Sequence, residues 1–491
     1  MMSRQTHVNA SMNFLAQRLA DRLSTRREFL TRCGLGMGGV GLAGLLAEQG
    51  LGNAAASGGL GVPNPLAPRA PHFPAKAKRV IHFFAQGGPS QVDTWDPKPS
   101  LTKHDGKSLK GVSTHANNDG AAFGSPFKFQ KYGKSGIEVS EVFANVAQHV
   151  DHMTVVRSMY SETPSHENAM LLLNCGDQRL PRPSLGSWTV YGLGTENQNL
   201  PGFIAMSPNG RPLQGDQNWQ SAFLPGIYQG TYLDPKHEQV EKLVEYVRNS
   251  AQSPTEQRRQ LDLVYKLNEE HSRKRAHDSQ LEARIQTFET AFRMQLEAMD
   301  AFDISKEPAA VRKRYGEGVQ ARQTLIARRL IERGVRFVQL YQNSWDHHGQ
   351  IETGLRSAAK EVDQPIAALI TDLRERGLLD ETLIIWAGEF GRTPVMDLNQ
   401  NVDQSKGKGR DHNNRGFSIW MAGGGVKGGH VHGATDDFGF AAVENKVEIA
   451  DLHATILQLL GFDHEKLTFR YAGRDFRLTD IKGQVVKELM A

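Results

Sequence analysis

The sequence predicts an α/β fold with a mostly parallel sheet. From residue 78 onward, short apolar runs with strand character alternate with segments of helical spacing, which is the pattern of βαβ units. Several of these runs end in glycines or polar residues, as buried parallel strands do where they enter a loop. A chain of 491 residues with 39% hydrophobic content is long enough to bury such a core.

The first half of the pattern begins with a strand within residues 78–88 (KRVIHFFAQGG), whose β-branched and aromatic run ends at two glycines. Residues 139–153 have helical spacing and precede a second strand at 154–159. The polar segment SETPSHENAM then leads into an apolar helix.

The second half repeats this alternation. A helix stops at Gly334 and a strand ends at Tyr341. Pro365 predicts that the next helix begins late or kinks before the strand DETLIIWAG. A strand with the sequence FSIWMAGGG and a final helix over 447–462 close the pattern.

The N-terminus reads as a twin-arginine export signal. Arg26 and Arg27 precede a glycine-rich apolar run that is too short and too weak to span a bilayer permanently. We therefore expect a signal peptide over 1–56, a proline-rich linker over 57–78, passage through the twin-arginine export machinery, and a periplasmic or extracellular location. The alternative, an amphipathic helix starting at Ser24, is disfavoured by the many glycines that follow.

Charge and cysteine content exclude some classes. The 58 basic and 54 acidic residues give a net charge of only +4, and no basic stripe carries interleaved aromatics, so nucleic acid is not an expected partner. Cys33 lies in the signal, which leaves Cys175 alone in the exported chain and permits no intrachain disulfide. Residues 234–315 are charged and helical in pattern, which indicates a solvated insertion or cap.

Candidate site residues gather where strands end. In open α/β sheets, ligands bind beyond the carboxyl ends of the strands. Five segments bring polar or glycine-rich loops to that edge, and their convergence is the main functional signal. These segments are residues 86–93, 162–166, 346–348, 389–392 and 411–412.

The segment WDHHG suggests a metal site. Asp346 and His348 offer oxygen and nitrogen ligands, which suit zinc, manganese or iron better than calcium, and His347 is the expected bystander. Glu389 and His412 follow at other strand ends. The alternative is an Asp-His pair that only caps or decorates a loop. His430 and His432 form either a second pair or an exposed loop that binds nothing, and His453 is expected to be a hydrogen-bonded core residue.

Two further residues could take part in chemistry. Ser165 lies near a helix N-terminus, where backbone N–H groups favour an anion, and its hydroxyl could attack phosphorus or sulfur; equally, serine is a common helix cap. Arg392 could clamp anionic oxygens, or it could form a salt bridge within a turn.

Several segments together resemble a family of exported proteins, domain of unknown function 1501, which is placed in the alkaline phosphatase and sulfatase superfamily. The resemblance runs from about residue 78 to 478. It implies a three-layer α/β/α sandwich over 79–478 with the helical insertion 234–315, followed by a C-terminal tail at 479–491. The matching segments are AQGGPSQVDTWDPKP, TPSHENAM, SLGSW, WDHHG, DETLIIWAGEFGRTP, GRDHN and YAGRDF.

The resemblance also implies a site. The superfamily carries a bimetal centre and a serine, threonine or modified cysteine nucleophile. Matched by position, Ser165 is the attacking hydroxyl, Asp346, His348 and His412 bind the first metal, and Glu389 binds the second. The expected cofactor is one or two divalent ions, zinc or manganese.

The sequence departs from this pattern at the second metal. Gln86 stands where an aspartate is usual, with Asp93 seven residues later, and Phe390 stands where a histidine is usual. His166 could supply a replacement nitrogen. The segment at Cys175 lacks the proline of a sulfatase modification signature, so a formylglycine mechanism is not expected.

Two functions remain open from the sequence. One is an exported metal-dependent hydrolase of phosphate or sulfate esters, small or polysaccharide, in which Ser165 attacks and Arg392 stabilises the developing charge. The other is a noncatalytic binding or structural protein that keeps the fold with a degenerate metal site.

Overall fold

The computed structural model describes residues 64–113, 119–197, 199–208, 210–243, 253–274, 300–397 and 408–491. The expected export signal lies outside these residues. Within them, no helix is both long and apolar enough to cross a membrane.

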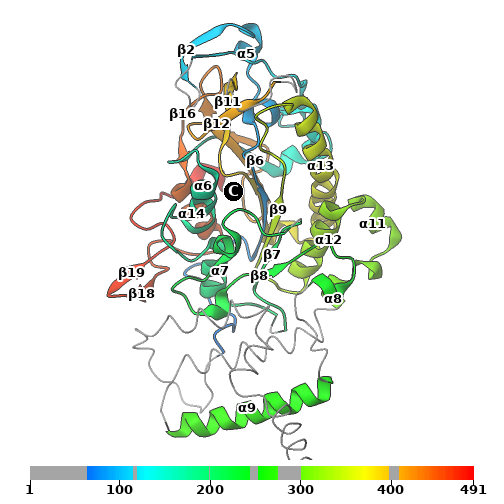
Figure 1. Ribbon diagram of the computed structural model, residues 1–491, viewed down its shortest axis with the longest axis vertical. Coiled ribbons are helices and arrows are strands. Elements are labelled where there is room, and N and C mark those ends of the chain that lie inside the picture. Colours follow the sequence, from blue (N-terminus) through cyan, green and yellow to red (C-terminus); the bar gives the residue numbers. More distant parts are fainter. Residues whose placement is uncertain are drawn as a thin grey trace, which may run out of the picture.

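A nine-stranded sheet forms the centre, in the order β14-β6-β13-β10-β1-β9-β7-β8, with β17 also paired to β6 (Figure 1). In this sheet β13 is antiparallel to both its neighbours, and the other pairs are parallel. The predicted mostly parallel α/β fold is therefore confirmed. The strands are β1 Arg79–Ala85, β6 Met153–Tyr160, β7 Phe203–Met206, β8 Thr231–Leu233, β9 Phe337–Gln342, β10 Thr382–Ala387, β13 Phe417–Ala422, β14 His430–His432 and β17 Val447–Glu448.

Strand β1 explains why its sequence is a continuous apolar run. It pairs in parallel with β9 on one side and β10 on the other. Its alternate side chains enter two different cores: Ile81 and Phe83 belong to one, and Val80 and Phe84 to the other. A strand buried on both faces has no polar face, so it cannot show the usual alternation.

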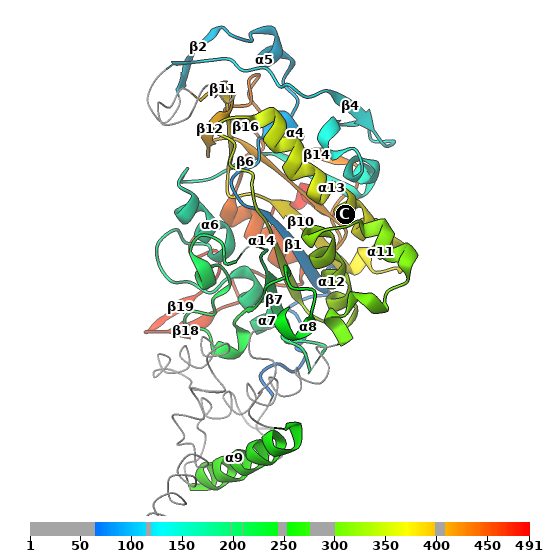
Figure 2. The same ribbon diagram turned by 45° about the vertical axis from the view of Figure 1, so that its right-hand side comes forward.

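Helices cover both faces of the sheet and make three layers (Figures 1 and 2). Helices α12 (Val319–Glu332) and α13 (Ile351–Glu375) pack into the core that contains Ile81 and Phe83. The opposite core is covered by α6 (His166–Cys175), α7 (Leu185–Leu193) and α14 (Ile449–Leu459).

Two local expectations differ from the structure. Helix α13 does not begin late but runs through Pro365, which is buried, because packing along its long apolar face outweighs the cost of about 3 kcal/mol or more that a proline imposes inside a helix. The helix expected over 139–153 is two short 3-10 helices, η1 (Glu141–Phe143) and η2 (Val146–His152). The Asp363 carboxylate accepts the backbone N–H of Asn145 and of Val146, and so separates the two turns.

Apart from the 21-residue helix α9, the remaining described elements are short. Among them, the β11–β12 hairpin adjoins the functional edge. They are α4 Gln91–Thr94, α5 Pro99–Lys103, β2 Ser108–Ser113, β3 Asp119–Ala121, β4 Phe129–Tyr132, β5 Ile137–Ser140, η3 Gly215–Trp219, η4 Gly226–Tyr228, α8 Val240–Leu243, α9 Pro254–Lys274, η5 Ile304–Lys306, α11 Ala309–Tyr315, η6 Leu379–Glu381, β11 Gly391–Met396, β12 Arg410–Asn413, β15 Ala434–Thr435, β16 Ala442–Glu444, β18 Phe469–Tyr471, β19 Arg474–Phe476 and η8 Lys487–Leu489.

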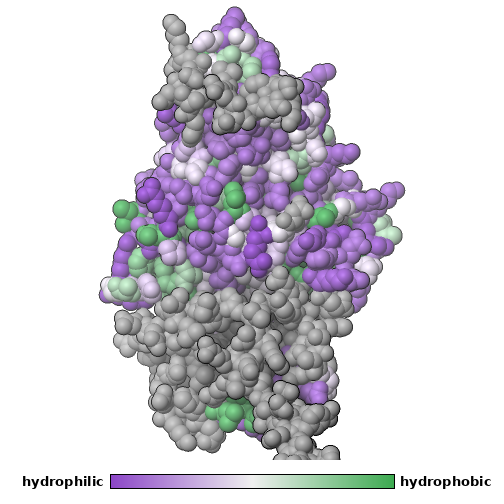
Figure 3. Space-filling view, in the orientation of Figure 1, coloured by the Kyte–Doolittle hydropathy of each residue, from purple (hydrophilic) through white to green (hydrophobic). Residues whose placement is uncertain are grey.

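The described part of the insertion 234–315 consists of α8, α9, η5, α11 and the segments that join them. Helix α9 lies apart from the sheet in both views (Figures 1 and 2), whereas α11 packs beside α13. Hydrophilic side chains cover most of the described surface on the face shown in Figure 3.

Both flanking segments pack against the domain where the structure describes them. In the expected linker, Leu66 is buried and the Arg69 N–H donates to the carbonyl of Leu193. At the expected tail, Leu489 is buried and its carbonyl accepts the N–H of Lys427. The described residues of the expected linker and of the expected tail are therefore packed as part of the folded domain.

The packing of the last residues predicts a stability cost. Leu489 is 0% exposed, so Leu489→Ala should lower the free energy of unfolding by about 2 to 5 kcal/mol. Ile481 is 80% exposed, and Ile481→Ala should change it by less than about 0.5 kcal/mol. Urea denaturation of both variants tests this; equal effects would show that the C-terminus does not belong to the core.

Candidate metal centre

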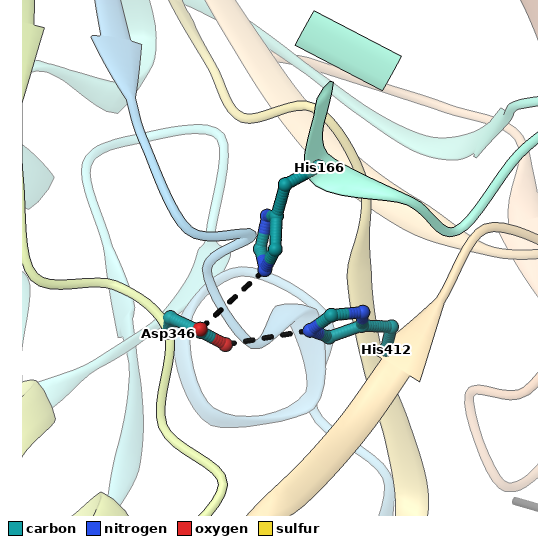
Figure 4. A group of neighbouring side chains, drawn as sticks. All are labelled: His166, Asp346 and His412. Carbon is teal, nitrogen blue, oxygen red and sulfur yellow. Dashed lines mark hydrogen bonds and ion pairs between the residues drawn. The ribbon is translucent and has the colours of Figure 1, made fainter. Parts of the chain in front are cut away.

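The candidate residues meet at the carboxyl edge of the sheet. Asp346 follows β9, Glu389 follows β10, and His166 opens α6 after β6. His412 comes from the β11–β12 hairpin, which precedes β13 and therefore reaches the same edge. Figure 4 shows His166, Asp346 and His412 pointing toward one another.

Three imidazole rings converge on the Asp346 carboxylate through their Nε2 atoms. His348 Nε2 lies 3.1 Å and His412 Nε2 lies 3.4 Å from Asp346 Oδ1. His166 Nε2 lies 3.4 Å from Oδ2, and the Nε2 atoms of His348 and His412 are 2.9 Å apart. The four side chains thus surround one small volume.

The other nitrogen of each ring, Nδ1, is held by an oxygen acceptor. A ring fixed at Nδ1 presents the lone pair of Nε2 to the centre, which is the usual arrangement around metal-ligating histidines. The acceptors are Glu389 Oε1 for His166 at 2.6 Å, Asp397 Oδ2 for His348 at 2.7 Å, and the carbonyl of Pro164 for His412 at 2.9 Å.

This donor set fits a divalent metal ion. A tetrahedral shell with bonds of 2.0 to 2.1 Å places neighbouring donors about 3.3 Å apart, and the measured separations are 2.9 to 3.4 Å. His166, Asp346 and His412 form a group with metal-binding spacing, and so do His348, Asp411 and His412. Three imidazoles and one carboxylate suit zinc, and also manganese.

Glu389 lies beside His166 at the centre. Its Oε1 accepts from His166 and from the N–H of Gly87 at 2.9 Å, so it orients a histidine ligand. Its Oε2 is buried and has no hydrogen-bond partner among the described residues, and the same holds for Gln86 Oε1. Glu389 therefore holds the His166 ring through Oε1, and its expected role as a metal ligand through Oε2 stays a prediction.

The other expected parts of a second metal site are absent from this edge. Asp93 is fully buried and receives two bonds from the Arg410 guanidinium and one from Ser90, so it does not replace the aspartate that Gln86 lacks. The Phe390 ring packs 4.8 Å from His166 and 4.7 Å from His412 between centroids. An apolar ring thus stands where a second nitrogen ligand was expected.

Arg392 has no donor left for a substrate, so its expected role as an anion clamp is not supported. A guanidinium has five N–H donors, and the Arg392 side chain is 0% exposed. Four of these donors meet oxygen acceptors inside the protein and the fifth faces His348 Nε2, so the residue ties the neighbouring segments to Asp346. The acceptors are the carbonyls of Gly87, Gly88 and Arg410, Asp346 Oδ1, and His348 Nε2 at 3.4 Å.

Gly87 lets the first loop approach the metal centre. Its φ of +117° is unfavourable for other residues, and a Cβ there would lie 2.5 Å from the backbone nitrogen of Asp346. Glycine is therefore required at position 87 both by the backbone conformation and by the close packing against Asp346.

Ser165 stands at the N-cap position of α6, yet its hydroxyl does not cap the helix. Instead it donates to Glu167 Oε2 at 3.0 Å. The preceding carbonyl, of Pro164, accepts from His412, so Ser165 lies beside the metal centre, although none of its described hydrogen bonds reaches Asp346.

Three of the other histidines lie elsewhere. His347 is packed against Gly354 of α13 and belongs to neither metal-binding group. His430 and His432 pair with the start of β6, at the opposite edge of the sheet. His453 is buried and hydrogen-bonded to the carbonyl of Leu173, as expected of a core residue.

The sequence reasoning missed Asp397 and Glu167. Asp397 follows β11 and is buried, and no nearby motif marks it. Glu167 lies two residues after Ser165, and its contact depends on the rotamer that the serine adopts. The contact of Asp397 with His348 and that of Glu167 with Ser165 can be recognised only in the folded structure.

The close packing of these charged groups shifts their pKa values in the metal-free protein. Burial lowers the pKa of His166, but its hydrogen bonds to Asp346 and Glu389 outweigh that effect and raise the pKa to about 9. The pKa of His348 is raised to about 9 in the same way by Asp346 and Asp397, whereas burial lowers that of His412. Burial opposes ionisation of Asp346, but the three histidines and Arg392 hold its pKa well below the usual range.

The sequence model of a protein family of unknown function, DUF1501, matches residues 77–490. The chain belongs to the DUF1501 family. The resemblance stated from the sequence motifs is thereby confirmed, and a search of curated proteins gave no match to this DUF1501 protein.

Solved structures similar to this DUF1501 protein include three enzymes of low sequence identity. The lipoteichoic acid synthase LtaP from Listeria monocytogenes is 9% identical, with a TM-score of 0.36, over 82% of this chain and 75% of that one. Alkaline phosphatase from the Antarctic bacterium TAB5 is 10% identical, with a TM-score of 0.33, over 78% and 98%. The PsFucS1 sulfatase from Pseudoalteromonas sp. is 12% identical, with a TM-score of 0.33, over 79% and 68%.

The raised histidine pKa values predict how stability depends on pH. In metal-free protein, His166 and His348 titrate at about 9 when folded and near 6.5 when unfolded. Their stabilising effect is therefore complete below pH 6.5 and lost as pH rises through 9, so the free energy of unfolding should fall over that range. Denaturant titrations at pH 6.5, 7.5 and 9 measure this, with a His166→Gln, His348→Gln double variant as the control. An equal slope in the control would contradict the assignment.

The internal bonds of Arg392 predict a structural role. Arg392→Lys keeps the charge but supplies only three donors in a different geometry, which leaves buried carbonyls unpaired and should lower the free energy of unfolding by more than about 2 kcal/mol. Thermal and urea unfolding test this. A variant as stable as the parent protein would instead favour an exposed role for the guanidinium.

Proposed function

We propose that this protein is a metal-dependent hydrolase of phosphate or sulfate esters. The observation that carries the proposal is the convergence of three Nε2 atoms on Asp346, each ring being fixed by a separate acceptor on Nδ1. A divalent ion, zinc or manganese, would supply Lewis acidity toward an ester oxygen at this point. One ion fits the donor set better than two, because Phe390 offers no ligand and Asp93 is already bound by Arg410.

In this proposal the ligands are His166, Asp346, His348 and His412. Glu389 and Asp397 act through the rings they hold: they fix which nitrogen carries the proton and keep the ligands in place before a metal arrives. Arg392 has the same kind of role toward Asp346 and stays out of contact with substrate.

Ser165 is the proposed nucleophile. Its hydroxyl donates to the Glu167 carboxylate, which is placed to receive the proton as the serine oxygen bonds to phosphorus or sulfur and the alcohol of the ester leaves; water then hydrolyses the serine ester and releases phosphate or sulfate. The N–H groups at the start of α6 favour the negative charge of a phosphoryl or sulfuryl group. The substrate class is a small-molecule or polysaccharide ester.

A second candidate function is a noncatalytic binding or structural protein that retains the fold. The observation in its favour is the loss of the second metal site: Gln86 offers an amide, Phe390 is apolar, and Asp93 is neutralised by Arg410. Under this alternative the metal is structural and Ser165 has no role in turnover.

We also propose that the protein is exported through the twin-arginine pathway to the periplasm or beyond. The paired arginines Arg26 and Arg27 and the apolar run after them support this. Because that pathway carries folded proteins, the metal centre would be assembled before export.

The proposal predicts metal content and turnover together. Purified protein should hold about one equivalent of transition metal by elemental mass spectrometry, and an Asp346→Ala, His348→Ala variant should hold none. Ser165→Ala should keep the metal but lose at least about 100-fold in kcat on aryl phosphate or aryl sulfate esters. The matched control is Ser135→Ala, which removes an exposed hydroxyl of the β4–β5 turn.

Each failure of that experiment has a distinct meaning. A folded protein without metal would contradict the metal centre and the hydrolase together. Bound metal with no turnover of either ester would contradict the hydrolase proposal and favour the binding role, whereas equal turnover in Ser165→Ala would contradict only the serine mechanism.

A further inference from the structure

We propose that Glu167 restricts the site to esters whose tetrahedral group carries a single negative charge. Such esters are sulfate monoesters and phosphate diesters, whereas a phosphate monoester carries two charges above about pH 6. The inference rests on the proposed function, because it takes Ser165 as the nucleophile beside the metal centre. It follows from the charges that surround the serine hydroxyl.

The Glu167 carboxylate lies where the transferred group would arrive. Its Oε2 accepts from the Ser165 hydroxyl at 3.0 Å, so a group that bonds to this hydroxyl oxygen brings its own charged oxygens close to the carboxylate. Glu167 is exposed in the first turn of α6. Solvent therefore weakens its repulsion of a negative group but does not remove it.

The neighbours of Glu167 leave its negative charge in place. The carboxylate accepts its own backbone N–H and the Ser165 hydroxyl, and both bonds favour the ionised form. No lysine or arginine nitrogen of the described chain lies within 4.0 Å of it. The nearby His166 and His412 rings are neutral when they bind a metal ion, so they do not balance this charge.

The arginines near the site are already engaged. The Arg392 guanidinium is 0% exposed and bonds to Asp346 and to backbone carbonyls. Arg410 is fully buried in another ion pair. The Arg415 guanidinium stacks on the Phe440 ring, 5.2 Å from its centroid. None of these three side chains is free to bind a second negative charge on a substrate.

The groups around Ser165 leave no positive charge in excess among the described residues. One divalent ion and Arg392 would supply three positive charges, and the carboxylates of Asp346, Glu389 and Glu167 already balance them. A singly charged ester therefore leaves one uncompensated negative charge, and a doubly charged ester leaves two. Because an uncompensated charge is costly in a partly buried volume, the site favours the singly charged ester.

Hydrolysis adds one negative charge to the bound group. With a sulfate monoester, the Ser165 oxygen bonds to sulfur, the alcohol leaves, and the serine proton passes by way of Glu167 to that alcohol. Water then restores the serine hydroxyl and releases doubly charged sulfate and a proton. With a phosphate diester, one alcohol leaves in the same way and the product is a doubly charged phosphate monoester. Glu167 therefore repels the product more than the substrate and favours its release.

Two esters with the same leaving group test the selection by charge. On metal-loaded enzyme at pH 8, kcat/KM for methyl 4-nitrophenyl phosphate, with one charge, should exceed that for 4-nitrophenyl phosphate, with two, at least about 10-fold. A third substrate, 4-nitrophenyl sulfate, distinguishes a sulfatase from a diesterase, and turnover of either singly charged ester agrees with the inference. An equal or higher kcat/KM for 4-nitrophenyl phosphate would overturn the inference and leave the hydrolase proposal in place.

A binding measurement separates the charge of Glu167 from its part in proton transfer. Methyl(phenyl)phosphinate and phenylphosphonate contain no ester bond and differ by one negative charge at pH 8.5. In titration calorimetry on zinc-loaded protein, Glu167→Gln should tighten binding of phenylphosphonate at least about 5-fold and of the phosphinate about 2-fold, as expected of an exposed charge. The matched control is Glu444→Gln, which removes an exposed charge on β16 and should change neither affinity.

The outcomes distinguish this inference from the proposed function. Equal tightening of both anions by Glu167→Gln, tightening of neither, or the same effect from Glu444→Gln would overturn the inference. If no ester is turned over, the proposed function fails, and the two affinities still decide whether Glu167 selects by charge. Because Glu167 is exposed, Glu167→Gln should change the free energy of unfolding by less than about 0.5 kcal/mol, so the variant remains folded for the measurement.

Discussion

The Asp346 carboxylate is the group on which the site depends. It lies at the end of β9 and is contacted by three imidazole rings and by the buried guanidinium of Arg392. Removing it would leave four nitrogen-bearing groups facing one another, some of them positively charged, inside a partly buried volume. The same crowding explains why the carboxylate stays ionised and why two neighbouring histidines hold their protons in the metal-free protein.

Backbone groups hold this arrangement as much as side chains do. Arg392 binds the carbonyls of Gly87 and Gly88 from the loop after β1 and the carbonyl of Arg410 from β12. Gly87 in turn touches the backbone of Asp346 and donates its N–H to Glu389. The loops at the edge of the sheet therefore form one connected unit, and a metal ion would bind to ligands whose positions are already set.

The departures from a two-metal pattern fit together physically. His166 occupies the space beside Glu389 and uses its carboxylate as a hydrogen-bond partner. Phe390 packs against two of the rings, and Arg410 neutralises Asp93 within the core. These features leave fewer ligands for a second metal, and the contacts of Glu389 and Phe390 hold the rings of the candidate centre.

Much of this edge could be predicted from the sequence, because strand ends in a parallel sheet converge. The strand at β1 and the nearness of Asp346 and His348 to His166, Glu389 and His412 followed from that rule. The role of each residue within the cluster could not be predicted from the convergence of strand ends. The five donors of Arg392 are used by carbonyls and side chains distant in sequence, which no local pattern encodes.

Local propensity also gave way to tertiary contacts. Pro365 lies inside an unbroken helix because the helix is packed along its length, and Asp363 of that helix divides the expected helix at 139–153. Asp397 became visible only once β11 placed it behind His348. Element types along the sheet were therefore easier to predict than the partners of individual polar groups.

The position of the bound metal tests the single-centre account most directly. Anomalous diffraction from crystals of zinc-loaded protein, recorded on both sides of the zinc edge, would locate every bound ion. The account predicts one peak, bordered by Asp346 and by the Nε2 atoms of His166, His348 and His412. A second peak between Gln86 and Glu389, or a peak that His166 does not border, would contradict it.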